Sequence, residues 1–86
     1  MPIVSQFFGI TIRVNPRDHS PLHFHAKYAE DEASVEITTG KILAGVLPPR
    51  ARRFVGEWLE LHRDEILENW NCVQGGRPGF DIEPLR

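Results

Sequence analysis

The sequence is poor in cysteine and has no long apolar run, and both scarcities bear on its compartment. Its single cysteine, Cys72, cannot form an internal disulfide, so the cytoplasm is the expected location. No apolar stretch approaches the roughly 20 residues that a membrane-spanning helix needs. The first residues, Met1 to Gln6, also lack the basic start and apolar core of a secretory signal. We therefore expect a cytoplasmic protein with no membrane partner.

The chain also lacks an excess of charge of one sign. Its 10 Lys and Arg against 12 Asp and Glu leave a formal net charge of -2, so nucleic acid is only a weak candidate partner, through local patches. A content of 41% hydrophobic and 26% charged residues is typical of globular proteins. With 86 residues we expect a single domain over 1–86. So small a domain has a modest core, which favours a protein partner or a homodimer.

Alternating apolar residues predict short strands between about residues 7 and 46. The first is expected to bury the alternating side chains Phe8, Ile10, Ile12 and Val14. Further strands are expected at 23–28, 33–38 and 42–46, with another short one in the tail at 80–83. Because the runs are close in sequence, we expect them to pair antiparallel.

One long amphipathic helix is predicted after the strands. Pro48 and Pro49 mark its start, and it should run from about Arg50 to about Trp70, leaving 71–86 as a tail. The predicted fold class is thus α+β, a small antiparallel sheet of three to five short strands packed against one C-terminal helix. The half of the helix expected to face the sheet carries Ala51, Phe54, Val55, Trp58, Leu59, Leu61, His62, Ile66 and Trp70.

Three of the four histidines fall within seven residues, namely His19, His23 and His25, with Asp18 beside them. His23 and His25 are two apart on a predicted strand, so their imidazoles leave the same face. A divalent metal such as zinc can use two such imidazoles, with Asp18 or His19 as a third ligand. Three other interpretations stay open: a polar surface or partner contact, acid–base cleavage of RNA without metal, and contact with an anion.

His62 is expected to lie apart from this cluster. It falls within the apolar half of the helix, where a satisfied core histidine is the favoured interpretation. If the helix covers the face that bears Phe24 and Ala26, then His23 and His25 point away from it. We therefore expect no site of three histidines within one monomer.

The charges of the predicted helix oppose its dipole, which favours anions at the start and cations at the end. A cluster of three arginines, Arg50, Arg52 and Arg53, stands at the start and is a candidate site for a phosphate or an RNA backbone. One outer stripe, called the acidic stripe below, is a candidate surface for docking a basic partner. It consists of Glu57, Glu60, Asp64 and Glu68. The alternative for both the arginine cluster and the acidic stripe is ordinary solvated surface, with a weak Arg53–Glu57 pair.

Three segments resemble a known bacterial family, "domain of unknown function 4160". They are Asp18–Tyr28, Leu47–Ala51 and Glu57–Arg63, and the likeness extends from about Ile3 to Trp70. Members usually read Pro-Pro-His-Phe-His where this chain has Leu22 before His23. The resemblance implies a β-rich start followed by a helix, and a gene that often lies beside another small gene, as toxin and antitoxin genes do. It implies no activity.

Two functions follow as hypotheses. The first is a cytoplasmic protein-interaction module, one member of a toxin–antitoxin-like pair, which docks through the acidic stripe or an exposed strand edge. The second is a small enzyme, metal-dependent or acid–base, that acts on RNA or another phosphodiester through His23, His25, either Asp18 or His19, and a helper arginine. The sequence does not decide whether the chain is an enzyme.

Overall fold

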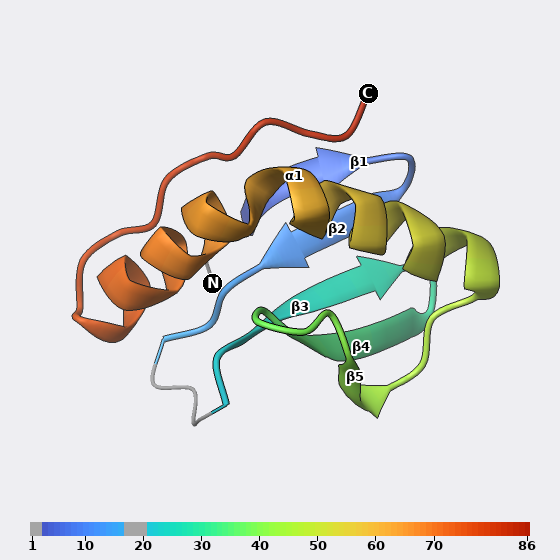
Figure 1. Cartoon of the computed structure of the whole chain (residues 1–86), viewed down its shortest axis with the longest axis horizontal. Helices are drawn as coiled ribbons and strands as arrows, with labels where there is room; N and C mark the ends of the chain where they lie inside the picture. Colours follow the sequence, from blue (N-terminus) through green and yellow to red (C-terminus); the bar gives the residue numbers. More distant parts are fainter. Residues whose placement is uncertain (1–2, 17–20) are drawn as a thin grey trace.

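The computed structural model describes residues 3–16 and 21–86, and it has the predicted α+β architecture (Figure 1). Five strands form one sheet in the order β1-β2-β3-β4-β5, and every neighbouring pair is antiparallel. A single long helix, α1, lies across one face of this sheet (Figure 1). The elements are β1 (Ile3–Phe7), β2 (Ile10–Arg13), β3 (His23–Tyr28), β4 (Asp31–Glu36), β5 (Ile42–Gly45) and α1 (Pro49–Gln74).

The first hairpin corrects the prediction of one strand that begins at Phe8. The chain instead forms β1 and β2, which are joined by a two-residue turn at Phe8 and Gly9. Both turn residues have positive φ, 50° and 80°, as tight hairpin turns of this twist require. The side chain of Phe8 is therefore 53% exposed instead of buried, although Ile10, Ile12 and Val14 are buried as expected.

The core lies between α1 and the sheet, with Trp58 at its centre. Trp58 is fully buried, its ring stacks on Phe7 at 5.8 Å between centroids, and it meets the ring of Phe24 edge-on at 5.7 Å. Phe24 and Ala26 are both fully buried, so α1 covers the β3 face that the alternation predicts. The indole Nε1 of Trp58 donates a hydrogen bond to the carbonyl of Glu83, which ties the tail to the helix.

The helix is longer than predicted, and it also differs from the prediction at Leu61 and His62. It ends at Gln74 instead of near Trp70, and its backbone leaves helical geometry at His62 (φ -128°, ψ 24°). Leu61, expected on the buried half, is 68% exposed. The first turn has no acidic residue and contains Arg50 and Arg52, so its charges oppose the dipole, whereas the last turn has no basic residue to favour it.

The tail after α1 returns to the sheet without forming the predicted strand. It runs back along α1 on the β1 side (Figure 1). Within the described residues it makes one backbone hydrogen bond to the sheet, from the amide of Ile82 to the carbonyl of Val4. Ile82 and Leu85 are buried by this path, so the tail covers the β1 edge and leaves β5 as the other edge strand.

No helix in the described part of the chain combines the length and apolar character that a membrane crossing requires.

Candidate functional site

The histidine pair lies on the face of the sheet opposite α1. Along β3 the buried side chains of Phe24 and Ala26 alternate with the half-buried His23 and His25. The two imidazole rings meet edge to face, with 5.1 Å between their centroids. The prediction that both histidines leave the same face of one strand is confirmed.

His23 is oriented by contacts at the start of β3. Its Nδ1 lies 2.8 Å from the carbonyl oxygen of Pro21, and its ring centroid lies 5.3 Å from that of Trp70. A carbonyl oxygen only accepts hydrogen bonds, so this contact assigns a proton to Nδ1 of His23. A metal or a substrate proton would then meet Nε2, the other nitrogen of the ring.

His25 belongs to a polar row that crosses three strands. Its direct neighbours in the register are Arg13 on β2 and Ser34 on β4. The Oγ of Ser34 lies 3.4 Å from Nδ1 of His25, and Oε2 of Glu32 lies 3.9 Å from the same nitrogen. Arg13 donates a hydrogen bond of 2.5 Å to that Glu32 oxygen.

This row does not have the arrangement of a serine hydrolase. In such an enzyme the histidine meets the serine and the acid through different ring nitrogens. Here Ser34 and Glu32 both approach Nδ1 of His25. The arrangement instead sets one imidazole beside a carboxylate and a guanidinium, which suits acid–base or anion chemistry. A depression of about 340 Å³ adjoins it and is lined by His25, Glu32, Ala33, Ser34, Ala44 and Gly45.

The predicted metal site is only partly visible. Asp18 and His19 lie outside the described residues. Within residues 3–16 and 21–86, no group of three His, Cys, Asp or Glu side chains gathers in a geometry that could hold a metal ion. The structure therefore brings together His23 and His25 as two candidate nitrogen ligands. The metal site stays a prediction that requires a ligand from the undescribed segment.

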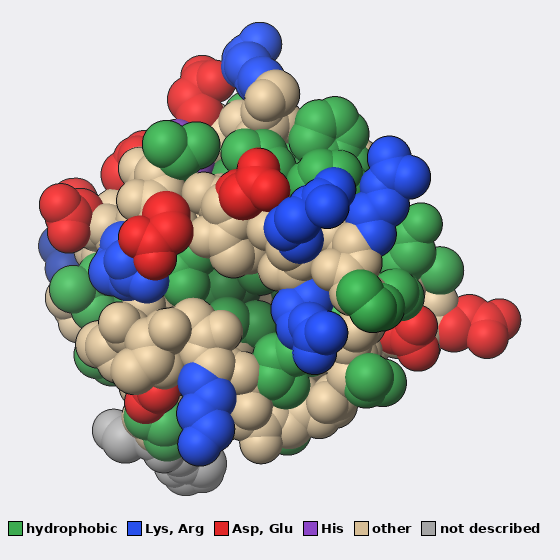
Figure 2. Space-filling view, turned by 45° about the vertical axis from the view of Figure 1, so that its right-hand side comes forward, with side chains coloured by type: hydrophobic (Ala, Val, Ile, Leu, Met, Phe, Trp, Pro, Cys, Tyr) green, Lys and Arg blue, Asp and Glu red, His purple; other side chains and the backbone are tan. Residues whose placement is uncertain are grey.

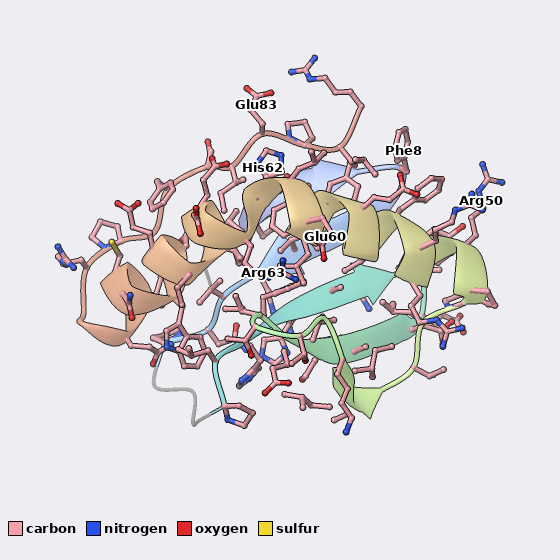
Figure 3. All side chains as sticks on the ribbon, in the orientation of Figure 1. Phe8, Arg50, Glu60, His62, Arg63 and Glu83 are labelled. Atoms are coloured by element: carbon pink, nitrogen blue, oxygen red, sulfur yellow. The ribbon has the colours of Figure 1, made fainter. Side chains whose placement is uncertain are left out.

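His62 is satisfied locally but is not a core residue. Its Nδ1 lies 2.6 Å from Oε1 of Glu65, its ring lies 5.6 Å from that of Trp58, and its side chain is 14% exposed. Figure 3 places His62 on the side of α1 that faces the tail. The expected separation from His23 and His25, which lie on the opposite face of the sheet, agrees with these contacts.

The arginines at the start of α1 flank an apolar pocket. Arg50, Arg52 and Arg53 are exposed, and the guanidiniums of Arg50 and Arg53 lie 5.5 and 5.4 Å from the ring centroid of Phe54. The ring of Phe8 lies 4.9 Å from that of Phe54. We call the hollow beside them the aromatic pocket; it measures about 540 Å³ and is lined by Phe8, Tyr28, Pro48, Arg50, Ala51 and Phe54.

Sequence reasoning did not find this pocket. Its lining comes from the β1–β2 turn, from the end of β3 and from the start of α1. Figure 2 turns this end of the molecule toward the viewer and shows Lys and Arg side chains beside exposed hydrophobic ones. One sequence signal could have indicated the exposed ring of Phe8. The dipeptide Phe8-Gly9 is a candidate hairpin turn as well as part of an alternating run.

The acidic stripe lies on the outer surface of α1. The side chains of Glu57 and Glu60 are 55% and 72% exposed, and Asp64 and Glu68 are exposed as well. Glu57 lies 3.7 Å from Arg53, the weak pair that the sequence suggests. Glu60 lies 3.2 Å from Arg63 (Figure 3). In the described part of the chain, Asp64 and Glu68 have no ion pair.

Comparison with protein families gives one match. The family described as "Domain of unknown function (DUF4160)" matches residues 9–71, which is most of the chain. The chain belongs to this family. The match includes the histidine pair on β3, the arginines at the start of α1 and the whole acidic stripe, all within 9–71. Neither the curated proteins nor the solved structures contain a match to the chain.

Proposed function

We propose that this DUF4160 protein is a cytoplasmic protein-interaction module, one member of a bacterial two-gene pair of the toxin–antitoxin type. Its docking surface is the acidic stripe of α1. The observation that supports this most directly is the exposure of Leu61, at 68%, among exposed carboxylates on the same helix. A partner that docks on the stripe could bury this side chain and so add an apolar contact to the charged ones.

The charges of the stripe favour a partner over the isolated monomer. Glu57, Glu60, Asp64 and Glu68 follow one another at intervals of three and four residues, where like charges on a helix repel. A basic partner surface would relieve this repulsion and accelerate encounter. The edge strand β5 is a second docking route, because Leu43 within it and Val46 directly after it are 39% and 63% exposed.

Charge reversal of the stripe tests this proposal. The protein is co-expressed with the product of the adjacent gene, and capture is compared between the wild type and a Glu60→Lys, Asp64→Lys variant. We expect the variant to lose at least ten-fold in captured partner, because two attractive contacts become repulsive. A matched control, Glu30→Lys with Asp81→Lys, makes the same net charge change at exposed positions outside α1. Equal capture by both variants would exclude the stripe as the interface.

The alternative function is a small enzyme that acts on RNA or another phosphodiester. The observation that favours it is the row formed by Arg13, His25 and Glu32 beside the depression on the sheet face. An untagged preparation is assayed for RNA cleavage and metal content beside a His23→Ala, His25→Ala variant. Cleavage that disappears in the variant would support this function, and equal cleavage by both proteins would exclude it.

A further inference from the structure

We propose that a second copy of this chain is a binding partner of the acidic stripe. Leu61 of each copy enters the aromatic pocket of the other, and the two α1 helices lie antiparallel across a two-fold axis. This inference rests on the proposed role of the stripe as a docking surface, and it names the surface that the stripe recognises.

The two surfaces are complementary in shape and in charge. The pocket is apolar within and has Arg50 and Arg53 beside it. The stripe presents one exposed apolar side chain, Leu61, between Glu60 and Asp64. Leu61 with its neighbouring carboxylates therefore complements the apolar pocket with its neighbouring arginines.

The helix geometry allows both contacts to form at once. Leu61 follows Phe54 by seven residues, which is two turns or about 10 Å of helix, so both project from the same side of α1. When two copies pack antiparallel along this side, Leu61 of each faces Phe54 of the other. Arg50 of one copy then lies within a turn of the partner's Asp64. The same patch serves both copies, as two-fold symmetry requires.

In the described part of the chain, two of the four charges used in this contact have no ion pair of their own, and the other two have only exposed pairs on the same helix, Arg53 with Glu57 at 3.7 Å and Glu60 with Arg63 at 3.2 Å. Arg50 and Asp64 have no ion pair within residues 3–16 and 21–86. The Arg53–Glu57 pair is an exposed one, because the two side chains are 67% and 55% exposed. A polyanion such as RNA would meet the arginines but would be repelled by the carboxylates that follow on the same helix. A second copy satisfies both groups.

Complementary charge reversal provides the test. One variant carries Arg50→Glu and Arg53→Glu, and the other carries Glu60→Arg and Asp64→Arg. The wild type is expected to sediment as a dimer at low salt and to dissociate as salt or dilution increases. Each variant alone is expected to be a monomer, because its two surfaces then have the same sign. A 1:1 mixture is expected to restore the dimer, since each reversed surface meets its complement.

The mixture also controls for folding, because a misfolded variant would not regain its partner. The control variant Glu30→Arg with Asp81→Arg should dimerise like the wild type. A wild type that stays monomeric up to about 1 mM, the range of very weak association, would overturn the inference. So would two variants that dimerise alone. If the wild type is monomeric while capture of the adjacent gene product still needs Glu60 and Asp64, the inference fails and the proposed function stands.

Discussion

Phe8 is the residue at which local sequence pattern and backbone conformation conflict most. It continues an apolar alternation, yet it occupies the left-handed region with a φ of 50°, where a non-glycine residue is strained. The turn tolerates it because Gly9 supplies the next positive φ, and because its ring packs on Phe54 at 4.9 Å. This turn conformation places the ring of Phe8 in the lining of the aromatic pocket.

Two glycines have opposite steric surroundings and make a matched pair for a stability test. Gly45 has a φ of 79°, and an added Cβ there would overlap the backbone of Glu32. Gly56 lies on α1, where an added Cβ would meet nothing.

We expect Gly45→Ala to lower the free energy of unfolding by about 2 kcal/mol or more, from strain and overlap together. Gly56→Ala should raise it by about 0.5–1 kcal/mol, because glycine weakens a helix relative to alanine. Urea denaturation of both variants beside the wild type measures the two shifts. Shifts of the same sign would contradict the steric description of these sites.

At the scale of elements, α1 owes its stability to packing more than to its own sequence. It begins without a side-chain cap, has arginines instead of acidic residues in its first turn, and has no basic residue in its last turn. It buries a side of the cylinder that contains Trp58, Leu59 and Ile66, each at most 1% exposed. Burial of large apolar side chains contributes about 1.5–3 kcal/mol each, which outweighs the small dipole terms.

The tail is a second element whose position depends on specific polar contacts with α1. Asn69 is fully buried, and its Nδ2 donates a hydrogen bond of 2.7 Å to the carbonyl of Phe80. Gly79 passes so close that an added Cβ would overlap the Asn69 side chain. Asn69 therefore holds the tail against the helix at the point where the chain reverses direction.

Asn69→Ala is expected to lower the free energy of unfolding by about 2 kcal/mol, because it removes a fully buried side chain together with its hydrogen bond to the carbonyl of Phe80. The amide of Ile82 should also exchange with solvent faster, since the tail then opens more readily from Val4. Asn71→Ala, an exposed change on the same helix, serves as the control. Unchanged exchange at Ile82 in the Asn69 variant would show that Asn69 does not hold the tail.

For the whole molecule, the decisive feature is that the candidate surfaces lie on opposite sides of one sheet. The acidic stripe and the aromatic pocket belong to α1 and the end of the sheet beside its start, while His23 and His25 alternate along β3 with the buried side chains that α1 covers. The two functions can therefore be separated by mutation. The His23→Ala, His25→Ala variant should capture the adjacent gene product as well as the wild type does.

Circular dichroism must accompany that measurement, because the ring of His23 lies 5.3 Å from that of Trp70. The Glu60→Lys, Asp64→Lys variant provides the comparison for loss of capture. Capture that fails in the histidine variant while its spectrum is unchanged would move the interface from α1 to the sheet face.

The sequence predicted those parts of the candidate site whose residues are close together in the chain, and missed those whose residues are far apart in it. His23 and His25 share a strand, so the two-residue period alone placed them on one face. Arg13, Glu32 and Ser34 join His25 only through the registers of β2 with β3 and of β3 with β4. The aromatic pocket requires Phe8, Tyr28 and Phe54 to meet from three distant segments, and no local period reports such a meeting.

The sequence by itself determined the α+β class, the antiparallel pairing, the extent of β3 and nearly that of β5, and the exposed acidic stripe, while β4 begins two residues before the predicted strand at 33–38. These properties follow from periods of 2 and 3.6 residues and from short connections, which are local. Only the tertiary structure decided that the side chains of Phe8 and Leu61 are exposed and that the tail covers the edge of β1 without forming a strand. Those outcomes depend on which surfaces α1 and the sheet leave uncovered once Trp58 is buried between them, and burial is a property of the packed whole.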